Sequence, residues 1–141
     1  MATTTAVINI TSDIIDSGFA LSKTMTMTQA GVVTGIENTN GLGIKKLSLT
    51  TAVVLELAAD ATASGANKIY IRNTGSNKAE HVKISFNASA SADTTVQIIG
   101  RLYGGDWMLI PWEADGTTHN VIAAPSTAAE VTTIEYMTFH Q

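Results

Sequence analysis

The feature that most constrains the fold is a Gly-Gly pair set between two apolar-rich runs of the chain. The pair, Gly104 and Gly105, lies within residues 100–112, a segment that holds both tryptophans. Two adjacent glycines can supply the positive φ angles that a two-residue type I′ hairpin turn requires. The sequence therefore predicts a β-hairpin in which Tyr103 lies opposite Asp106.

Alternation of side chains along this hairpin predicts two different faces. One face carries no charge and is expected to lie on the core: Ile98, Gly100, Leu102, Trp107, Leu109 and Pro111. The other, the mixed face, combines apolar and charged side chains: Ile99, Arg101, Tyr103, Asp106, Met108, Ile110 and Trp112. Such a mixture indicates either a contact surface or a face that a loop or a second sheet covers.

The rest of the chain also favours strands. Segments 68–72, 81–86 and 131–139 are rich in alternating, β-branched or aromatic residues. Similar short runs recur about every ten residues between Gly-, Asn- and Ser-containing turns. Residues 12–21 could form a helix, but its end is poorly capped. We expect an all-β fold of about eight to ten short strands, a β-sandwich with the jelly roll as first choice.

The chain divides by composition into two parts. Residues 1–30 are rich in Thr and poor in charge, which predicts either an N-terminal arm that touches a neighbour or edge strands of the main domain. Residues 31–141 are expected to form a single β-sandwich domain. Within this domain the apolar alternation changes phase at Lys45-Lys46, which predicts a β-bulge.

Charge and cysteine content exclude several classes of protein. A formal net charge of -4 argues against a nucleic-acid partner. The chain has no cysteine, so packing rather than disulfides or thiolate metal sites must stabilise it. The N-terminus lacks the basic and apolar character of a signal peptide, and no apolar run is long enough to cross a bilayer. We therefore expect synthesis in a cytoplasm and no membrane partner.

Side chains that could carry out chemistry are scattered along the chain. His81, His119 and His140 show none of the spacings that zinc sites use. Glu113 and Asp115 are close enough in sequence for acid–base catalysis, but their Glu-Ala-Asp-Gly context is typical of a solvated turn. No Gly-x-Ser-x-Gly or phosphate-loop motif occurs. We expect no enzyme, no cofactor and no metal site.

Three segments together resemble small jelly-roll virion proteins of tailed bacteriophages, the capsid decoration or cement proteins. They read Lys-Ile-Tyr-Ile-Arg-Asn-Thr-Gly at 68–75, Gly-Arg-Leu-Tyr-Gly-Gly-Asp-Trp-Met-Leu-Ile-Pro-Trp at 100–112, and Ile-Glu-Tyr-Met-Thr-Phe at 134–139. The resemblance implies a non-enzymatic protein on the virion surface that binds and stabilises the outer capsid shell. Its partners would be the major capsid protein and further copies of itself, as a dimer or trimer.

Two contact regions are expected on this basis. The oligomer contact is predicted on the mixed face, at Tyr103, Met108, Ile110 and Trp112. The capsid contact is predicted at Val7, Ile8, Lys45 and Lys46.

An alternative keeps the fold and changes the class of function. In it, the chain is a carbohydrate-binding jelly-roll module of a phage tail or receptor-binding protein. Tyr103 and Trp112 would then be the surfaces on which sugar rings stack. No coiled-coil assembly segment is visible in the sequence, which favours the decoration protein.

Overall fold

The computed structural model describes residues 5–12, 19–26, 38–48, 52–61, 65, 67–87, 97–126 and 131–140. Two compact units are present, Met1–Glu37 and Asn38–Gln141. The described residues form antiparallel strands and a single turn of 3-10 helix, η1 (Ala58–Asp60). The prediction of an all-β fold is therefore confirmed.

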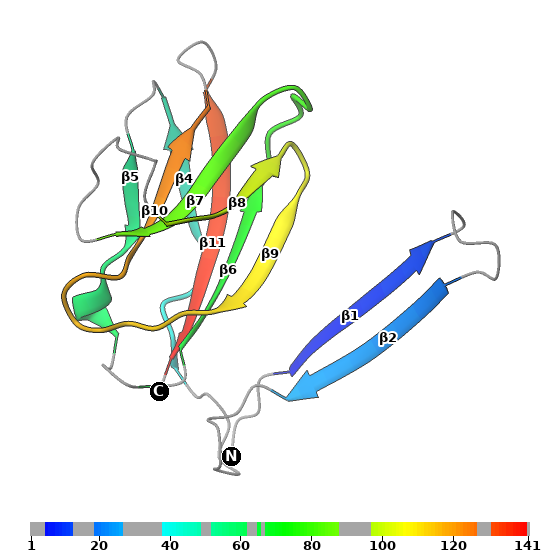
Figure 1. Cartoon of the computed structure of the whole chain (residues 1–141), viewed down its shortest axis with the longest axis horizontal. Helices are drawn as coiled ribbons and strands as arrows, with labels where there is room; N and C mark the ends of the chain where they lie inside the picture. Colours follow the sequence, from blue (N-terminus) through cyan, green and yellow to red (C-terminus); the bar gives the residue numbers. More distant parts are fainter. Residues whose placement is uncertain are drawn as a thin grey trace. The chain divides into compact units, whose positions relative to one another are not determined.

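In the first unit, β1 (Thr5–Ser12) and β2 (Phe19–Thr26) form a two-stranded antiparallel ribbon (Figure 1). The two strands pair without interruption over all 8 residues of each. The β-branched residues Thr, Val and Ile make up much of β1. Their side chains are restricted at χ1 and favour strands. Neither strand pairs with any other described strand, so each has one backbone edge without a strand partner.

The second unit is a sandwich of two sheets (Figure 1). One sheet has the order β5 (Val53–Glu56), β10 (Asn120–Pro125), β7 (His81–Asn87) and β8 (Ile98–Tyr103). The other has the order β3 (Asn38–Thr39), β11 (Thr132–His140), β6 (Lys68–Asn73) and β9 (Trp107–Pro111). A fifth strand of this second sheet, β4 (Gly43–Leu47), also pairs with β11.

The strand order is that of a jelly roll. β3 and β4 pair with different parts of β11 and together form one edge strand. With β3 and β4 counted as one strand, this unit has eight strands, which can be numbered 1 to 8 in chain order. Strands 1, 8, 3 and 6 then form one sheet, and strands 2, 7, 4 and 5 form the other. This is the double Greek-key connectivity of jelly rolls. The predicted β-sandwich is confirmed.

The core lies between the two sheets and follows the alternation of the strands. On β6, Ile69 and Ile71 are fully buried while Arg72 faces away from the core. Both sheets contribute large buried side chains: Leu47, Ile69, Ile71, Val82, Ile84, Val121 and Ile134. Because each such side chain contributes roughly 1.5–3 kcal/mol on burial, packing can stabilise this unit without disulfides.

The turn at Gly104-Gly105 is present, but the predicted hairpin is wrong. β8 pairs with β7 in one sheet, whereas β9 pairs with β6 in the other. The Asp106 N–H donates to the Tyr103 carbonyl at 2.9 Å, and of the two glycines Gly105 alone has a positive φ, of 94°. This is the pattern of a type II turn, which splays the strands it joins. The chain therefore passes here from one sheet to the other.

The corner beside this turn is held by the side chain of Asn73, which is 2% exposed. Its Nδ2 donates to the Leu102 carbonyl of β8 at 3.0 Å, and its Oδ1 accepts the Gly75 N–H at 2.9 Å. Its backbone carbonyl accepts the Gly105 N–H, and its own N–H donates to the Asp106 carbonyl. One residue at the end of β6 thus connects both sheets and the turn.

The crossing also decides which side of β9 faces the core. On β8, Leu102 is buried as expected. On β9, however, the side chains that pack against the core are Met108 and Ile110. The predicted core face is wrong for Trp107, which is 51% exposed, and for Ile98 and Pro111, which are also exposed. It is wrong for Leu109 as well, which lies on the same outward side of β9 as Trp107. Positions that share one face of a hairpin point in different directions when the two strands belong to facing sheets.

The β-bulge predicted at Lys45-Lys46 is absent. β4 pairs with β11 in continuous register, from Gly43 opposite Tyr136 to Leu47 opposite Thr132. The change of apolar phase has another cause, because Ile44 is an outward-facing residue that is 70% exposed while Leu47 is buried. An irregularity of register occurs instead between β7 and β8.

We expect Asn73→Ala to lower the free energy of unfolding by about 2–4 kcal/mol, because it leaves the Leu102 carbonyl and the Gly75 N–H without their partner. Urea unfolding followed by tryptophan fluorescence measures the loss. Thr74→Ala is the matched control, since the exposed Thr74 hydroxyl donates to the Thr133 carbonyl and its removal should cost less than about 1 kcal/mol. Equal losses in the two variants would contradict the role of Asn73.

Candidate functional site

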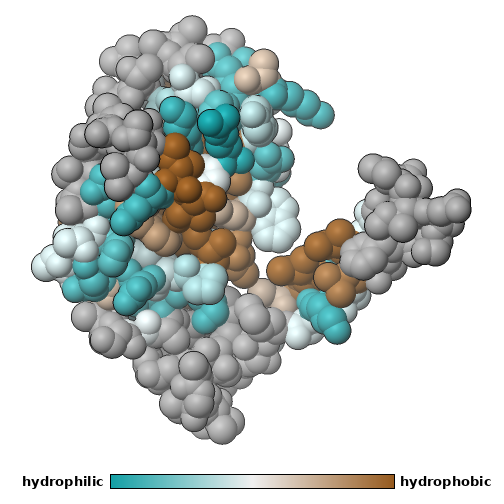
Figure 2. All heavy atoms as spheres, viewed as in Figure 1, coloured by the Kyte–Doolittle hydropathy of each residue, from teal (hydrophilic) through white to brown (hydrophobic). Residues whose placement is uncertain are grey.

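One face of the ribbon, called the apolar face, carries Ala6, Ile8, Ile10 and Leu21, with Lys23 as its charged residue. In its register Ile8 lies opposite Lys23 and Ile10 lies opposite Leu21, and side chains two residues apart in a strand share a face. Ile10 is 47% exposed, and hydrophobic residues are visible along the ribbon in Figure 2. A two-stranded ribbon has no second layer of its own and is marginally stable alone in water. Its apolar face therefore needs a partner surface.

The opposite face of the ribbon is mostly polar. It carries Thr5, Val7, Asn9, Thr11, Ser22 and Thr24. The Ser22 hydroxyl donates to Oδ1 of Asn9 across the strand pair. Val7 interrupts this polar surface and is 58% exposed. The two faces are chemically distinct, so a partner can recognise one of them in preference to the other.

The four residues predicted to contact the capsid have accessible side chains. Val7 and Ile8 belong to the polar and the apolar face of β1, respectively. Lys45 and Lys46 are both exposed on β4. Their contact with a capsid stays a prediction.

Of the four residues predicted to form the oligomer contact, Tyr103 lies at the surface. Met108 and Ile110 pack against the core instead. Trp112 is 2% exposed, and its indole Nε1 donates to the His119 carbonyl at 2.7 Å. These three side chains point inward because β8 and β9 lie in different sheets. A contact through Tyr103 stays a prediction, and the sugar platform expected from Tyr103 with Trp112 is not formed.

The outward face of the five-stranded sheet is a surface that the sequence did not reveal. It combines aromatic, aliphatic and charged side chains: Ile44, Lys46, Lys68, Tyr70, Arg72, Trp107, Leu109, Glu135, Met137 and Phe139. Alternation within single strands was visible in the sequence. The grouping was not, because it depends on β4, β6, β9 and β11 pairing across long sequence separations.

A polar network lies at the centre of this face. Oε1 of Glu135 accepts the Tyr70 hydroxyl at 2.8 Å and lies 3.4 Å from Nη1 of Arg72. Burial raises the pKa of the Tyr70 phenol, and its hydrogen bond to Glu135 raises that pKa further. The phenol therefore remains a hydrogen-bond donor at neutral pH, and Glu135 is held between two donors.

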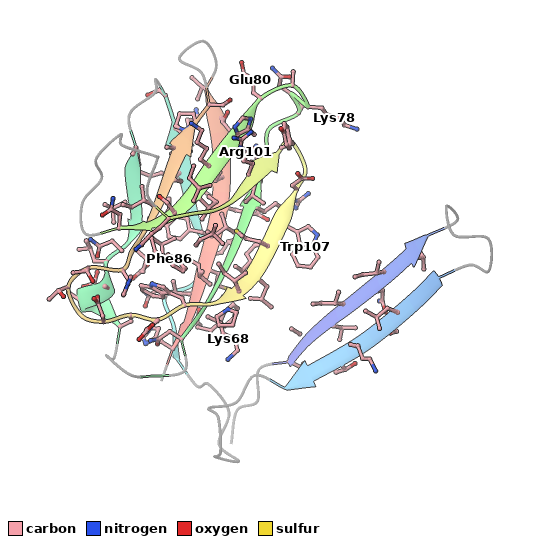
Figure 3. All side chains as sticks on the ribbon, viewed as in Figure 1. Lys68, Lys78, Glu80, Phe86, Arg101 and Trp107 are labelled. Carbon is pink, nitrogen blue, oxygen red and sulfur yellow. The ribbon has the colours of Figure 1, made fainter. Side chains whose placement is uncertain are left out.

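Trp107 stands beside this network. Its ring centroid lies 6.5 Å from that of Tyr70, and the two ring planes are tilted by 39°. Figure 3 shows the Trp107 side chain projecting from β9. An open hollow lies next to the Gly104-Gly105 turn and is lined by Tyr70, Arg72, Gly105 and Trp107. The hollow offers an aromatic surface with a cation and a carboxylate beside it.

The remaining ionisable residues have structural settings. Asp115 accepts the Thr118 hydroxyl and the N–H groups of Thr117, Thr118 and His119. These hydrogen bonds, led by that of the Thr118 hydroxyl, hold the pKa of Asp115 well below its usual value. Asp115 thus stabilises the turn in which it lies. Across the described ranges, no group of three or more His, Asp or Glu side chains could hold a metal ion.

Within the part of the chain that the structure describes, no helix is long and apolar enough to span a bilayer. Comparison of the chain with protein-family models, with curated proteins and with solved structures gives no match in any of the three.

The two tryptophans should differ in fluorescence. Trp107→Phe should keep the blue-shifted emission of the buried Trp112 and change stability by less than about 0.5 kcal/mol. Trp112→Phe should leave a red-shifted emission that acrylamide quenches. It should also lower the free energy of unfolding by about 1–3 kcal/mol, because the His119 carbonyl loses its donor. A readily quenched tryptophan in Trp107→Phe would contradict the burial of Trp112.

His81 should make the stability of the sandwich depend on pH. Burial lowers the pKa of His81, and the nearby cations Arg101 and Lys83 lower it further. The unfolded chain, in which a histidine has a pKa of about 6.5, then binds this proton more readily than the folded chain. Stability should fall as pH drops through about 6.5 and level off below the folded-state pKa.

Urea midpoints measured between about pH 7.5 and 5.5 test this dependence. We expect the midpoint of the unaltered chain to decrease over this interval and that of His81→Gln to decrease less. His140→Gln is the control, since it removes a histidine that lies elsewhere on the sandwich. The same decrease in His81→Gln as in the unaltered chain would refute the assignment.

Proposed function

We propose that this chain is a non-enzymatic structural protein of a virion, a decoration protein that binds the outer capsid shell as a homo-oligomer and stabilises it. The ribbon is its attachment element. The observation that carries the proposal is the apolar face of the ribbon, which has no second layer among the described residues of its own unit. The resemblance of residues 68–139 to decoration proteins supports the major capsid protein as partner.

The fold is compatible with this role. Jelly rolls occur in both viral capsid and lectin domains, so the fold alone does not assign a function. The ribbon adds the more specific argument. Two strands of 8 residues extend roughly 25 Å and present an elongated contact surface. The strand edges can also add to a sheet of the partner through backbone hydrogen bonds.

The apolar face of one ribbon alone would bind a shell weakly. Full burial of an Ile or Leu side chain contributes roughly 1.5–3 kcal/mol, and Ile8 and Leu21 are already partly covered. One ribbon therefore gains a few kcal/mol, before the cost of association is subtracted. Several ribbons in one oligomer would gain avidity on a repeating shell. This energetic limit favours a homo-oligomer as the binding species.

Lys45 and Lys46 would form a second, electrostatic contact. Both are exposed on β4, next to the outward-facing Ile44. Contacts between exposed charges are screened within about 8 Å at physiological ionic strength. Their contribution to shell binding should therefore decrease with salt, whereas that of the apolar ribbon face should persist.

Shell binding by an Ile8→Thr/Ile10→Thr double variant tests the proposal. Threonine keeps the β-branched shape, so the strand conformation is retained while two apolar side chains are lost. We expect at least about 30-fold weaker binding to bare shells of the major capsid protein, from a loss of about 2 kcal/mol or more. Cosedimentation of the full chain with shells measures it.

The control is Thr11→Ser, which alters the polar face of the same strand. It should bind shells as the unaltered chain does. All three proteins should show the same urea midpoint for the sandwich, because the changes lie in the other unit. Shell binding that is unchanged in the double variant would exclude the apolar face as the attachment surface.

A further inference from the structure

The outward face of the five-stranded sheet carries a second binding site, which we propose takes an acidic saccharide, a sugar that bears a carboxylate. The site is the hollow lined by Tyr70, Arg72, Gly105 and Trp107. It lies on the sandwich, and none of the four lining residues belongs to the ribbon or to the Lys45-Lys46 contact proposed for the shell.

The aromatic part of the site suits a sugar ring. Trp107 is half exposed, and it lies opposite Arg72 of β6, two residues along that strand from the partly covered Tyr70. Trp107 and Tyr70 lie 6.5 Å apart and tilted, so together they form a shallow, angled surface rather than a closed stack. Large aromatic side chains bury much apolar area and keep a polar tip in water. The C–H face of a pyranose can pack on such a surface while its hydroxyls stay solvated.

The polar part of the site is already positioned. Glu135 accepts from Tyr70 and pairs with Arg72, which orients both donors beside the indole. The Arg72 side chain is 47% exposed, and its contact with Glu135 is one long approach of 3.4 Å through Nη1. The guanidinium therefore keeps N–H groups for a ligand. Its fork geometry matches a carboxylate, which it can bind through two parallel hydrogen bonds.

The charge of this sheet face favours an anion. Its strands place Lys46, Lys68 and Arg72 outward against the single carboxylate of Glu135, which gives +3 and -1, or +2 in total. The whole chain has a net charge of -4, so this face is of opposite sign to the molecule. A concentrated positive region attracts anionic ligands.

The turn keeps the end of the hollow open. A Cβ built on Gly105 would meet no atom within 4 Å, so the space at this lining residue of the hollow is open. The backbone groups of β6 are engaged on both sides, by β9 and β11, so a peptide laid over this face could form few main-chain hydrogen bonds. Ring packing and recognition of a carboxylate do not need backbone groups, which favours a sugar as the occupant.

Titration of the full chain with sialyllactose and with lactose tests the proposal, because the two differ by the acidic sugar. Trp107 emission and isothermal titration calorimetry report binding. We expect sialyllactose to shift Trp107 emission and to bind at least tenfold more tightly than lactose. Trp107→Ala should lose the binding of both sugars. Arg72→Gln should abolish the preference for the acidic sugar while weak binding of lactose remains.

Tyr103→Ala is the matched control, since it removes an exposed aromatic ring from β8 in the other sheet. It should bind sialyllactose as the unaltered chain does. Circular dichroism and the urea midpoint establish that each variant is folded. Equal binding of sialyllactose by Trp107→Ala and the unaltered chain would overturn the site. Binding of polyglutamate as tight as that of sialyllactose would overturn the assignment to a saccharide.

The outcome is separable from that of shell binding. The Ile8→Thr/Ile10→Thr variant should retain sialyllactose binding, and Trp107→Ala should retain shell binding. Loss of both activities in either variant would overturn the independence of the two surfaces.

Discussion

The buried amide of Asn73 is the interaction on which the corner of the sandwich depends. It bonds to β8 in one sheet while its own backbone, at the end of β6, bonds to the turn that begins β9 in the other. Buried polar groups must be paired, so this arrangement is strongly specified once the corner closes. A Cβ on Gly104 would lie 2.7 Å from the Asn77 and Gly75 carbonyl oxygens, so the turn can approach this closely because it lacks a side chain there. The corner then sets the direction in which every side chain of β9 points.

Two surfaces of different character result from this architecture, one in each unit. The ribbon presents aliphatic side chains and unpaired strand edges, which suit a large protein surface and repeated weak contacts. The sheet face presents Trp107 beside a cation and a carboxylate, which suit a small polar ligand. A decoration protein with both would hold a shell chiefly through the ribbon and display a sugar-binding face on the sandwich.

Low charge and the absence of cysteine leave packing to stabilise the fold. The few charged side chains are not used to hold the core together. Asp115 stabilises a local turn, and the Arg72–Glu135 pair lies on an outward face where ion pairs contribute little to stability. Their positions instead give the molecule a basic face within an acidic chain. The charge distribution thus bears on recognition rather than on folding.

The sequence by itself determined the local structure: strands at 68–72, 81–86 and 131–139, a turn at Gly104-Gly105, and a sandwich stabilised without disulfides. Alternation shows which residues of one strand share a face. It does not show which strands pair, because partners such as β6 and β11 are far apart along the chain. Only the tertiary structure therefore decided that β8 and β9 lie in different sheets, that Trp107 is outside while Trp112 is buried, and that Tyr70 and Glu135 meet. Each of these depends on long-range pairing, which a local pattern of residues does not encode.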